Sequence, residues 1–143
     1  MPSQLSQHVE RRHDVVVIGG GSAGYAAART ACDAGADVAI VDQGPLGGLC
    51  ILRGCMPTKT ILRSAEIMAL MKRAREFGLA PVSARADLSA IVDRKNRLVK
   101  EFADYRIAAL RDPRFTLYEA RAEFVSSHEI RAGTWRIRGE SFV

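Results

Sequence analysis

The stretch Asp14-Val15-Val16-Val17-Ile18-Gly19-Gly20-Gly21-Ser22-Ala23-Gly24 decides the fold of this 143-residue chain. It opens with a β-branched run, which is typical of a strand buried on both faces of a parallel sheet. Helix-forming residues follow from 25 to 34, and Gly35 is placed to end that helix in a left-handed conformation. Residues 36–42 form a second apolar run that ends in a carboxylate. The pattern predicts a strand–helix–strand unit of about 30 residues.

The glycines between the first strand and the helix match a dinucleotide-binding fingerprint. Gly19 makes the tight turn, Gly21 lets the backbone approach a pyrophosphate, and Gly24 allows close packing of helix on strand. The pyrophosphate is expected at the helix N-terminus, beside the N–H groups of Ser22-Ala23. Asp42, which lies 18 residues after Gly24, is placed to accept hydrogen bonds from an adenosine ribose. The alternative is a glycine-rich turn without a ligand, and the motif alone does not decide between NAD and FAD.

A second motif, Gly47-Gly48-Leu49-Cys50-Ile51-Leu52-Arg53-Gly54-Cys55-Met56-Pro57-Thr58-Lys59, follows the second strand. On a regular helix, residues five apart have Cα atoms about 8.7 Å apart, whereas a disulfide needs about 4.4–6.8 Å. Cys50 and Cys55 can therefore form a disulfide only if the backbone bends between them, and Gly54 permits this. Pro57 suits the first turn of a helix. We expect a loop that runs into a helix, with the dipole lowering the pKa of Cys55 near the helix start.

Several kinds of site compete for these two cysteines. A structural zinc site needs four ligands, and the three histidines of the chain show no ligand spacing. Inert buried thiols or a metal-carrier pair would leave the glycines and the proline without a purpose. A redox-active disulfide fits best, because Cys50 lies eight residues past Asp42 and so beside the expected dinucleotide crevice. We therefore expect no metal site.

The rest of the chain predicts long helices followed by short strands, in an α/β fold. Residues 1–13 read as a disordered tail, and 14–143 as one domain that is incomplete at its C-terminus. The apolar stripe on the second long helix indicates core packing or a seam against a partner subunit. The expected helices are 57–77 and a second one that Asp87 caps, and the expected strands are 115–118, 122–125, 129–131, 135–138 and one beginning at 141–143.

Composition excludes several classes of protein. The formal charge of +5 comes from scattered arginines without a basic run, so we expect no nucleic-acid partner. No apolar run is long enough for a membrane-spanning helix, and the N-terminus does not resemble a secretory signal. Three cysteines are an odd number, which argues against a secreted disulfide scaffold. We expect a cytoplasmic protein.

The two motifs together resemble the pyridine nucleotide–disulfide oxidoreductases, which include dihydrolipoamide dehydrogenase, glutathione reductase and mercuric reductase. The resemblance implies a Rossmann-like FAD-binding domain, with FAD at the glycine motif, Asp42 and Gly48. It implies that Cys55 faces the flavin, whereas Cys50 exchanges with the substrate. Lys59 matches a lysine near flavin N5, and the backbone of Ala122 matches a contact to the adenine side of FAD.

Two positions depart from the family pattern, which usually has asparagine and an apolar residue where this chain has Leu52 and Arg53. Leu52 cannot donate an amide hydrogen bond. Arg53 places a cation between the two cysteines in the sequence, and we hypothesise that it stabilises a thiolate or recognises an anionic substrate. The alternative is an arginine that only faces solvent.

The resemblance predicts an FAD-dependent thiol–disulfide oxidoreductase that passes electrons between NAD(P)(H), FAD, the two cysteines and a small thiol or disulfide substrate. Full-length family members are longer, bind NAD(P)(H) in a separate domain and form homodimers, so this chain is expected to be an N-terminal fragment. One alternative is a non-catalytic dinucleotide-binding or interaction fragment. An NAD-dependent enzyme that uses only the strand–helix–strand unit is another, but the cysteine motif argues against it.

Overall fold

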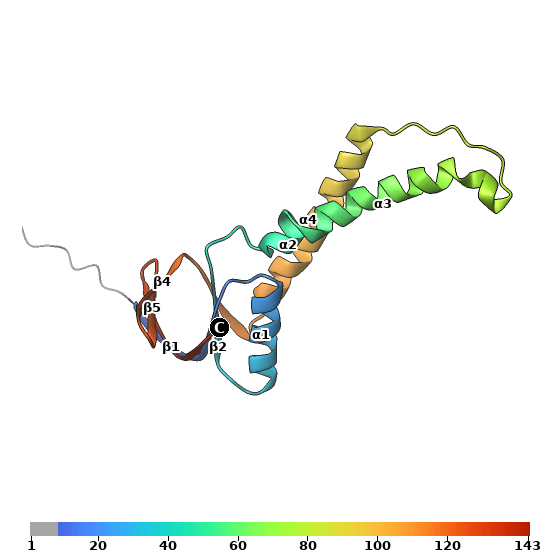
Figure 1. Ribbon diagram of the computed structural model, residues 1–143. Helices are drawn as coiled ribbons and strands as arrows, with labels where there is room; N and C mark the ends of the chain where they lie inside the picture. The colour runs from blue at the N-terminus through green and yellow to red at the C-terminus, as the bar shows by residue number, and fades with distance from the viewer. Residues whose placement is uncertain (1–8) are drawn as a thin grey trace, which may run out of the picture. The chain divides into compact units, whose positions relative to one another are not determined.

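The computed structural model describes residues 9–143, which form two compact units (Figure 1). One unit contains the described residues up to Gly48 together with Tyr105–Val143, and the other is Leu49–Asp104. The first unit begins with β1 (Val9–Ile18), α1 (Ser22–Asp33) and β2 (Val38–Asp42). Gly35 follows α1 with φ of +89°, so the predicted left-handed end of this helix is confirmed.

The six-stranded sheet of this unit combines a parallel and an antiparallel part. The strand order is β3-β2-β1-β6-β5-β4. Neighbours from β3 to β6 are parallel, whereas β6, β5 and β4 pair antiparallel. The strands of the C-terminal region are β3 (Phe115–Glu119), β4 (Ala122–Ser126), β5 (Glu129–Ala132) and β6 (Trp135–Phe142). The predicted fold class, parallel strands with short antiparallel strands after them, is confirmed.

Apolar side chains are buried on both faces of the parallel strands. Successive residues of β2 alternate between two clusters, with Val38 and Ile40 in one and Ala39 and Val41 in the other. The first cluster includes Ala28 of α1, and Leu110 and Phe115 pack into it as well. The second is completed by β5 and β6, through Ile130, Ala132 and Ile137. Burial on both faces explains why these strands consist of consecutive β-branched apolar residues instead of alternating apolar and polar residues.

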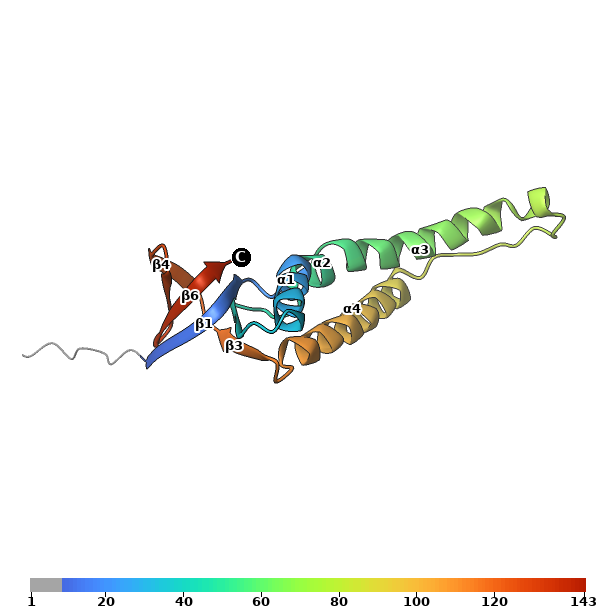
Figure 2. The ribbon, with the colours of Figure 1, turned by 90° about the horizontal axis from the view of Figure 1, so that it is seen from below.

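The predicted start of the first strand is wrong, because β1 begins at Val9 and not at Asp14. Val9 pairs with Trp135 and Arg12 with Arg138, so β6 determines that residues 9–13 are extended (Figure 2). His13 is buried, with Nδ1 2.9 Å from Asp37 Oδ2 and Nε2 3.0 Å from the Tyr118 hydroxyl. Residues 1–8 of the predicted tail lie outside the described residues.

The predicted separate strand at 141–143 is also wrong, because Trp135–Phe142 is one continuous strand. Gly139 makes the continuity possible, since a Cβ there would lie 2.8 Å from Val16 Cγ2 of the neighbouring β1. β6 lies between the two parts of the sheet, because it pairs parallel with β1 on one side and antiparallel with β5 on the other. The polar residues around Gly139 separate the two apolar runs, and the sequence prediction therefore treated these runs as two strands.

The second unit is helical. The helices are α2 (Gly48–Leu52), whose first residue belongs to the first unit, α3 (Cys55–Lys72), the 3₁₀ helix η1 (Ala74–Phe77) and α4 (Leu88–Leu110), which continues into the first unit. The predicted helix over 57–77 thus changes to 3₁₀ geometry before Gly78, whose φ of +73° ends it. Asp87 Oδ1 accepts a hydrogen bond of 3.0 Å from the Ala90 N–H, which confirms the predicted cap.

The apolar stripe on α4 is not core packing along its length. Leu88 and Tyr105 are largely exposed, and Phe102 is about half exposed. Leu110, at the end of the helix, is fully buried. Among the described residues, no helix is long and apolar enough to cross a membrane.

Replacing Leu110 by alanine should destabilise the protein by about 2–5 kcal/mol, because the change leaves a cavity in a closed cluster. Urea unfolding followed by circular dichroism measures this free energy. Leu79, which is 63% exposed, is the matched control, and Leu79→Ala should change stability by less than about 0.5 kcal/mol. Equal effects of the two substitutions would contradict the packing of Leu110 against α1.

Candidate functional site

The glycine turn between β1 and α1 requires glycine at two positions for steric reasons. Gly19 has φ of +105°, a conformation that L side chains disfavour. A Cβ on Gly24 would lie 1.8 Å from the carbonyl oxygen of Gly19. The close approach of α1 to β1 therefore depends on Gly24, as the fingerprint predicts.

Gly21 has no such steric reason within the protein. It is the N-cap residue of α1, with φ of −68° and ψ of −169°, and a Cβ there would meet nothing within 4 Å. No side chain of the described residues caps this helix end, and its first turn carries no acidic residue. The first N–H groups of α1, from Ser22-Ala23, thus adjoin open space with a positive dipole end. These features fit the pyrophosphate of a dinucleotide.

Asp42 connects this turn to the loop after β2. Its Oδ2 accepts a hydrogen bond from the Gly20 N–H, and its Oδ1 accepts one of 2.7 Å from the Gly44 N–H. A carboxylate offers about four acceptor positions. Asp42 can therefore hold the two loops together and still accept hydrogen bonds from ribose hydroxyls.

The start of the cysteine motif packs directly against the glycine turn. A Cβ on Gly48 would lie 2.7 Å from Gly21 Cα, and Gly48 has φ of +78°. Only glycine fits both restrictions. The two motifs that the sequence shows separately thus touch within one compact unit, at Gly48 and Gly21.

The backbone bends between the two cysteines, as their spacing requires. Cys50 lies in α2, whereas Cys55 is the first residue of α3. Gly54 separates the two helices with φ of −120° and ψ of −108°, and a Cβ there would lie 3.3 Å from Cys50 Cα. The predicted bend and the predicted helix start near Cys55 are confirmed, but the expected loop before them is partly the short helix α2. Both thiols are free, with Cys50 half-buried and Cys55 exposed.

The predicted effect on the pKa of Cys55 is wrong for the dithiol. The hydrogen bond shared with Cys50, and then the charge of a Cys50 thiolate, raise the pKa of Cys55 above its usual value. Lys59, one turn further along α3, lowers the pKa of Cys55 but does not outweigh these effects. The neighbouring Cys50 thiol therefore has the largest effect on the pKa of Cys55.

The other residues singled out in the sequence lie in different elements of the fold. Arg53 is exposed in the turn between α2 and α3, and it forms no ion pair with another described residue. Leu52, at the end of α2, is half-buried. Ala122 begins β4 and packs against the cluster that β5 and β6 complete. The guanidinium carbon of Arg106 in α4 lies 4.4 Å from the ring centroid of Tyr25 in α1, a contact that the sequence did not predict.

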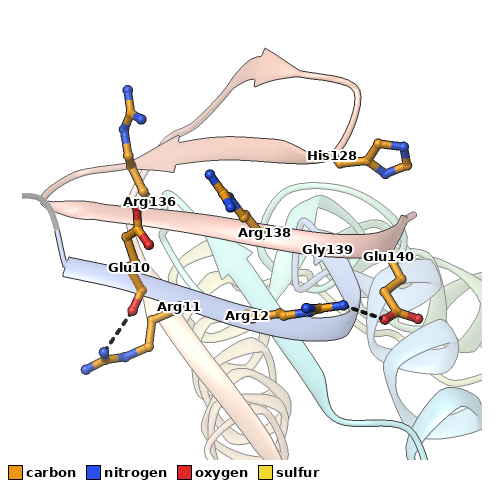
Figure 3. A pocket seen from close by; sticks show the side chains of 8 residues that line it. All are labelled: Glu10, Arg11, Arg12, His128, Arg136, Arg138, Gly139 and Glu140. Atoms are coloured by element: carbon orange, nitrogen blue, oxygen red, sulfur yellow. Dashed lines mark hydrogen bonds and ion pairs between the residues drawn. The ribbon is translucent and has the colours of Figure 1, made fainter.

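A separate pocket of about 530 Å³ lies on the charged side of β1 and β6 (Figure 3). Its arginines are mostly paired: Arg12 with Glu140, and Arg136 and Arg138 with Glu129. None of the predicted cofactor residues lines it. Within residues 9–143, no group of three or more histidine, cysteine or acidic side chains could hold a metal ion.

Comparison with known proteins agrees with this arrangement. Residues 13–141 match the family model described as pyridine nucleotide-disulphide oxidoreductase. A dihydrolipoyl dehydrogenase of Chlamydia muridarum is 38% identical over 118 residues, which are 82% of this chain and 25% of that protein. A mercuric reductase of Staphylococcus aureus is 33% identical over 99% of this chain and 26% of its own length.

A solved structure shows the same fold. The HOCl-induced flavoprotein disulfide reductase RclA from Escherichia coli superposes with a TM-score of 0.71 at 29% identity, over 90% of this chain and 27% of that one. The chain thus spans about a quarter of the relatives that it matches. From the family match and these relatives, the chain belongs to the pyridine nucleotide-disulphide oxidoreductases.

Proposed function

We propose that this chain is the FAD-binding part of a thiol–disulfide oxidoreductase in which Cys50 and Cys55 are the redox-active pair. The contact between Gly48 and Gly21 carries the proposal, because it joins the dithiol motif to the dinucleotide turn. Cys50 follows Gly48 by two residues in the sequence. A flavin can accept or donate an electron pair, and a dithiol exchanges two electrons when it becomes a disulfide. The electron count of the two groups therefore balances.

The cofactor would be held by the groups that surround the open space at Gly21. The N–H groups of the first turn of α1 would receive the pyrophosphate, and Asp42 the adenosine ribose. Gly19 and Gly24 shape the turn, and Gly48 keeps the second motif close to it. Lys59 and the backbone of Ala122 are further proposed contacts. FAD, when bound, would supply two-electron chemistry to the cysteines.

The dithiol would reduce a disulfide substrate in two exchange steps. The Cys50 thiolate attacks one sulfur of the substrate, forms a mixed disulfide and releases the first substrate thiol. The Cys55 thiolate then attacks the Cys50 sulfur, releases the second thiol and leaves the Cys50–Cys55 disulfide. Two electrons and two protons thus pass from the dithiol to the substrate, and the cofactor would return the electrons to the disulfide.

We extend the proposal to the full-length protein, for which the longer relatives are the guide. NAD(P)(H) would bind in a domain outside this chain, the substrate would be a small thiol or disulfide compound, and the full-length protein would be a cytoplasmic homodimer. A non-catalytic dinucleotide-binding fragment is the alternative. Purified chain incubated with FAD distinguishes the two: flavin absorbance that remains after desalting, together with reduction of the Cys50–Cys55 disulfide when the flavin is reduced, supports the oxidoreductase. Retained flavin without disulfide reduction favours the alternative.

Substituting Gly21 by alanine should leave the fold intact but weaken FAD binding at least tenfold. The new methyl group meets no protein atom and instead enters the space proposed for the pyrophosphate. Flavin fluorescence titration measures the affinity, and circular dichroism checks the fold. Gly24→Ala is the contrasting variant, because its Cβ would collide with Gly19 and should disrupt the turn itself. Unchanged FAD affinity in Gly21→Ala would place the cofactor elsewhere.

Replacing Cys50 by alanine should lower the pKa of Cys55, because both the shared hydrogen bond and the thiolate charge disappear. Below the Cys55 pKa of the unmodified chain, the variant should therefore hold more thiolate and react faster with iodoacetamide. Lys59→Met should shift the pKa in the opposite direction. Mass spectrometry of the Cys55 peptide across a pH series reports each pKa. An unchanged Cys55 pKa in Cys50→Ala would show that the thiols do not interact.

Substituting Arg53 by alanine should slow alkylation of the two cysteines by the anion iodoacetate about threefold, the effect of one charge at about 7 Å in water. Residues 43–65 contain no acidic residue, and although Arg63 pairs with Glu66, Arg53 and Lys59 should attract anions. The ratio of the iodoacetate rate to the rate with neutral iodoacetamide separates attraction of the reagent from a change in thiol pKa. Arg75→Ala, at another exposed position, is the control. An unchanged ratio would show that Arg53 does not attract negatively charged substrates.

A further inference from the structure

Arg53 lies on the same side of α2 as Cys50. It follows Cys50 by three residues, and its backbone N–H donates a hydrogen bond of 2.9 Å to the Leu49 carbonyl, so the helical turn extends to Arg53. Residues three apart on a helix are neighbours on its surface, with Cβ atoms about 5–6 Å apart. The thiol that we propose to attack the substrate therefore has an arginine beside it.

The side chain of Arg53 is exposed, and its charge is not neutralised by a carboxylate of residues 9–143. The two acidic residues nearest to it in the sequence have other partners. Asp42 accepts hydrogen bonds from two backbone N–H groups, and Glu66 pairs with Arg63. The guanidinium can therefore act on a charged molecule that approaches Cys50.

The second cysteine has a cation of its own. Lys59 follows Cys55 by four residues in α3, and its charge lowers the pKa of Cys55 against the larger effect of Cys50. Lys59 is also one of the proposed cofactor contacts. The two basic residues thus serve different thiols, and Arg53 is the one beside the thiol that meets the substrate.

We propose that Arg53 is a specificity-determining residue, which selects disulfide substrates that carry a carboxylate close to the attacked sulfur. The inference rests on the proposed function, because it takes Cys50 to be the attacking thiol. When Cys50 displaces one half of the substrate, the other half stays bonded to the Cys50 sulfur, and its carboxylate is then held near the guanidinium. Arg53 exchanges no electron or proton, so the two exchange steps balance as before.

Mixed disulfides trapped on Cys50 test the charge that the site prefers. With Cys55→Ser the second exchange step cannot occur. Dithiodipropionate, hydroxyethyl disulfide and cystamine then leave an anionic, a neutral and a cationic half on Cys50. Each adduct is brought to equilibrium with its own free thiol, and mass spectrometry that locates the adduct on Cys50 measures its amount. Any effect of Arg53 on the Cys50 thiol itself is shared by all three adducts and cancels in their ratios.

Arg53 should favour the anionic adduct about threefold and disfavour the cationic adduct about threefold, the effect of one charge at about 7 Å in water. Arg53→Gln should therefore lower the anionic-to-cationic ratio about ninefold. Arg53→Lys keeps the charge and should keep the ratio. Arg75→Gln, at another exposed position, is the matched control and should leave the ratio unchanged. In about 1 M salt the Debye length is about 3 Å, so the preference of the unsubstituted arginine should disappear.

The outcomes separate this inference from the proposed function. If Arg53→Gln leaves the ratio unchanged, or if the ratio does not respond to salt, the Arg53 inference fails. Retained flavin and reduction of the Cys50–Cys55 disulfide by reduced flavin would still support the oxidoreductase. If no probe forms an adduct on Cys50, that residue is not the attacking thiol and both proposals fail. The salt series requires no change at Arg53, so it decides the question even if Arg53→Gln does not fold.

Discussion

The close approach of α1 to β1 at Gly24 is the constraint on which the rest of the site depends. A side chain at this position would collide with the carbonyl oxygen of Gly19, so the helix can begin where it does only without one. Because α1 begins at Ser22, its first N–H groups have no partner in the described residues and adjoin the open space next to Gly21. It also sets the surface against which Gly48 packs. A single steric requirement thus produces both the uncapped helix start, which we propose as the cofactor site, and the surface against which Gly48 packs.

The electrostatics of the site follow from how few acidic groups it contains. Asp42 is the carboxylate at the turn, and backbone N–H groups already hold it in place. Around the cysteines, residues 43–65 include no acidic residue, and of their basic residues Arg63 pairs with Glu66. The Cys55 thiol, however, responds most strongly to Cys50, which raises the pKa of Cys55 despite Lys59. The pKa of Cys55 therefore depends mainly on the adjacent thiol. The surrounding basic residues would instead act on a charged substrate as it approaches the cysteines.

The sequence was sufficient to predict those parts of the fold that depend on residues close together in the chain. The β-branched run before Gly19, the glycine turn and the bend at Gly54 each depend on residues within a few positions. The extended conformation of residues 9–13 has another cause, namely pairing with β6, and nothing in their own polar sequence indicates it. The same holds for Gly139, whose close approach to Val16 of β1 depends on the pairing of β6 with β1. The contact between Arg106 and Tyr25 could not be predicted either, because it forms only when α4 and α1 are brought together.

The pairing of β1 with β6 also has a consequence for the order of folding. Val9 pairs with Trp135, so these partners are separated by 126 positions (135 − 9) in the chain. Contacts of such large sequence separation form slowly, because the long intervening loop must be closed first. The helices of Leu49–Asp104 need only local contacts and can form while the chain is still being synthesised. β1 instead lacks its β6 neighbour until residues 135–142 have been synthesised, so the hydrogen-bonding groups along that edge of β1 stay unpaired until late in folding.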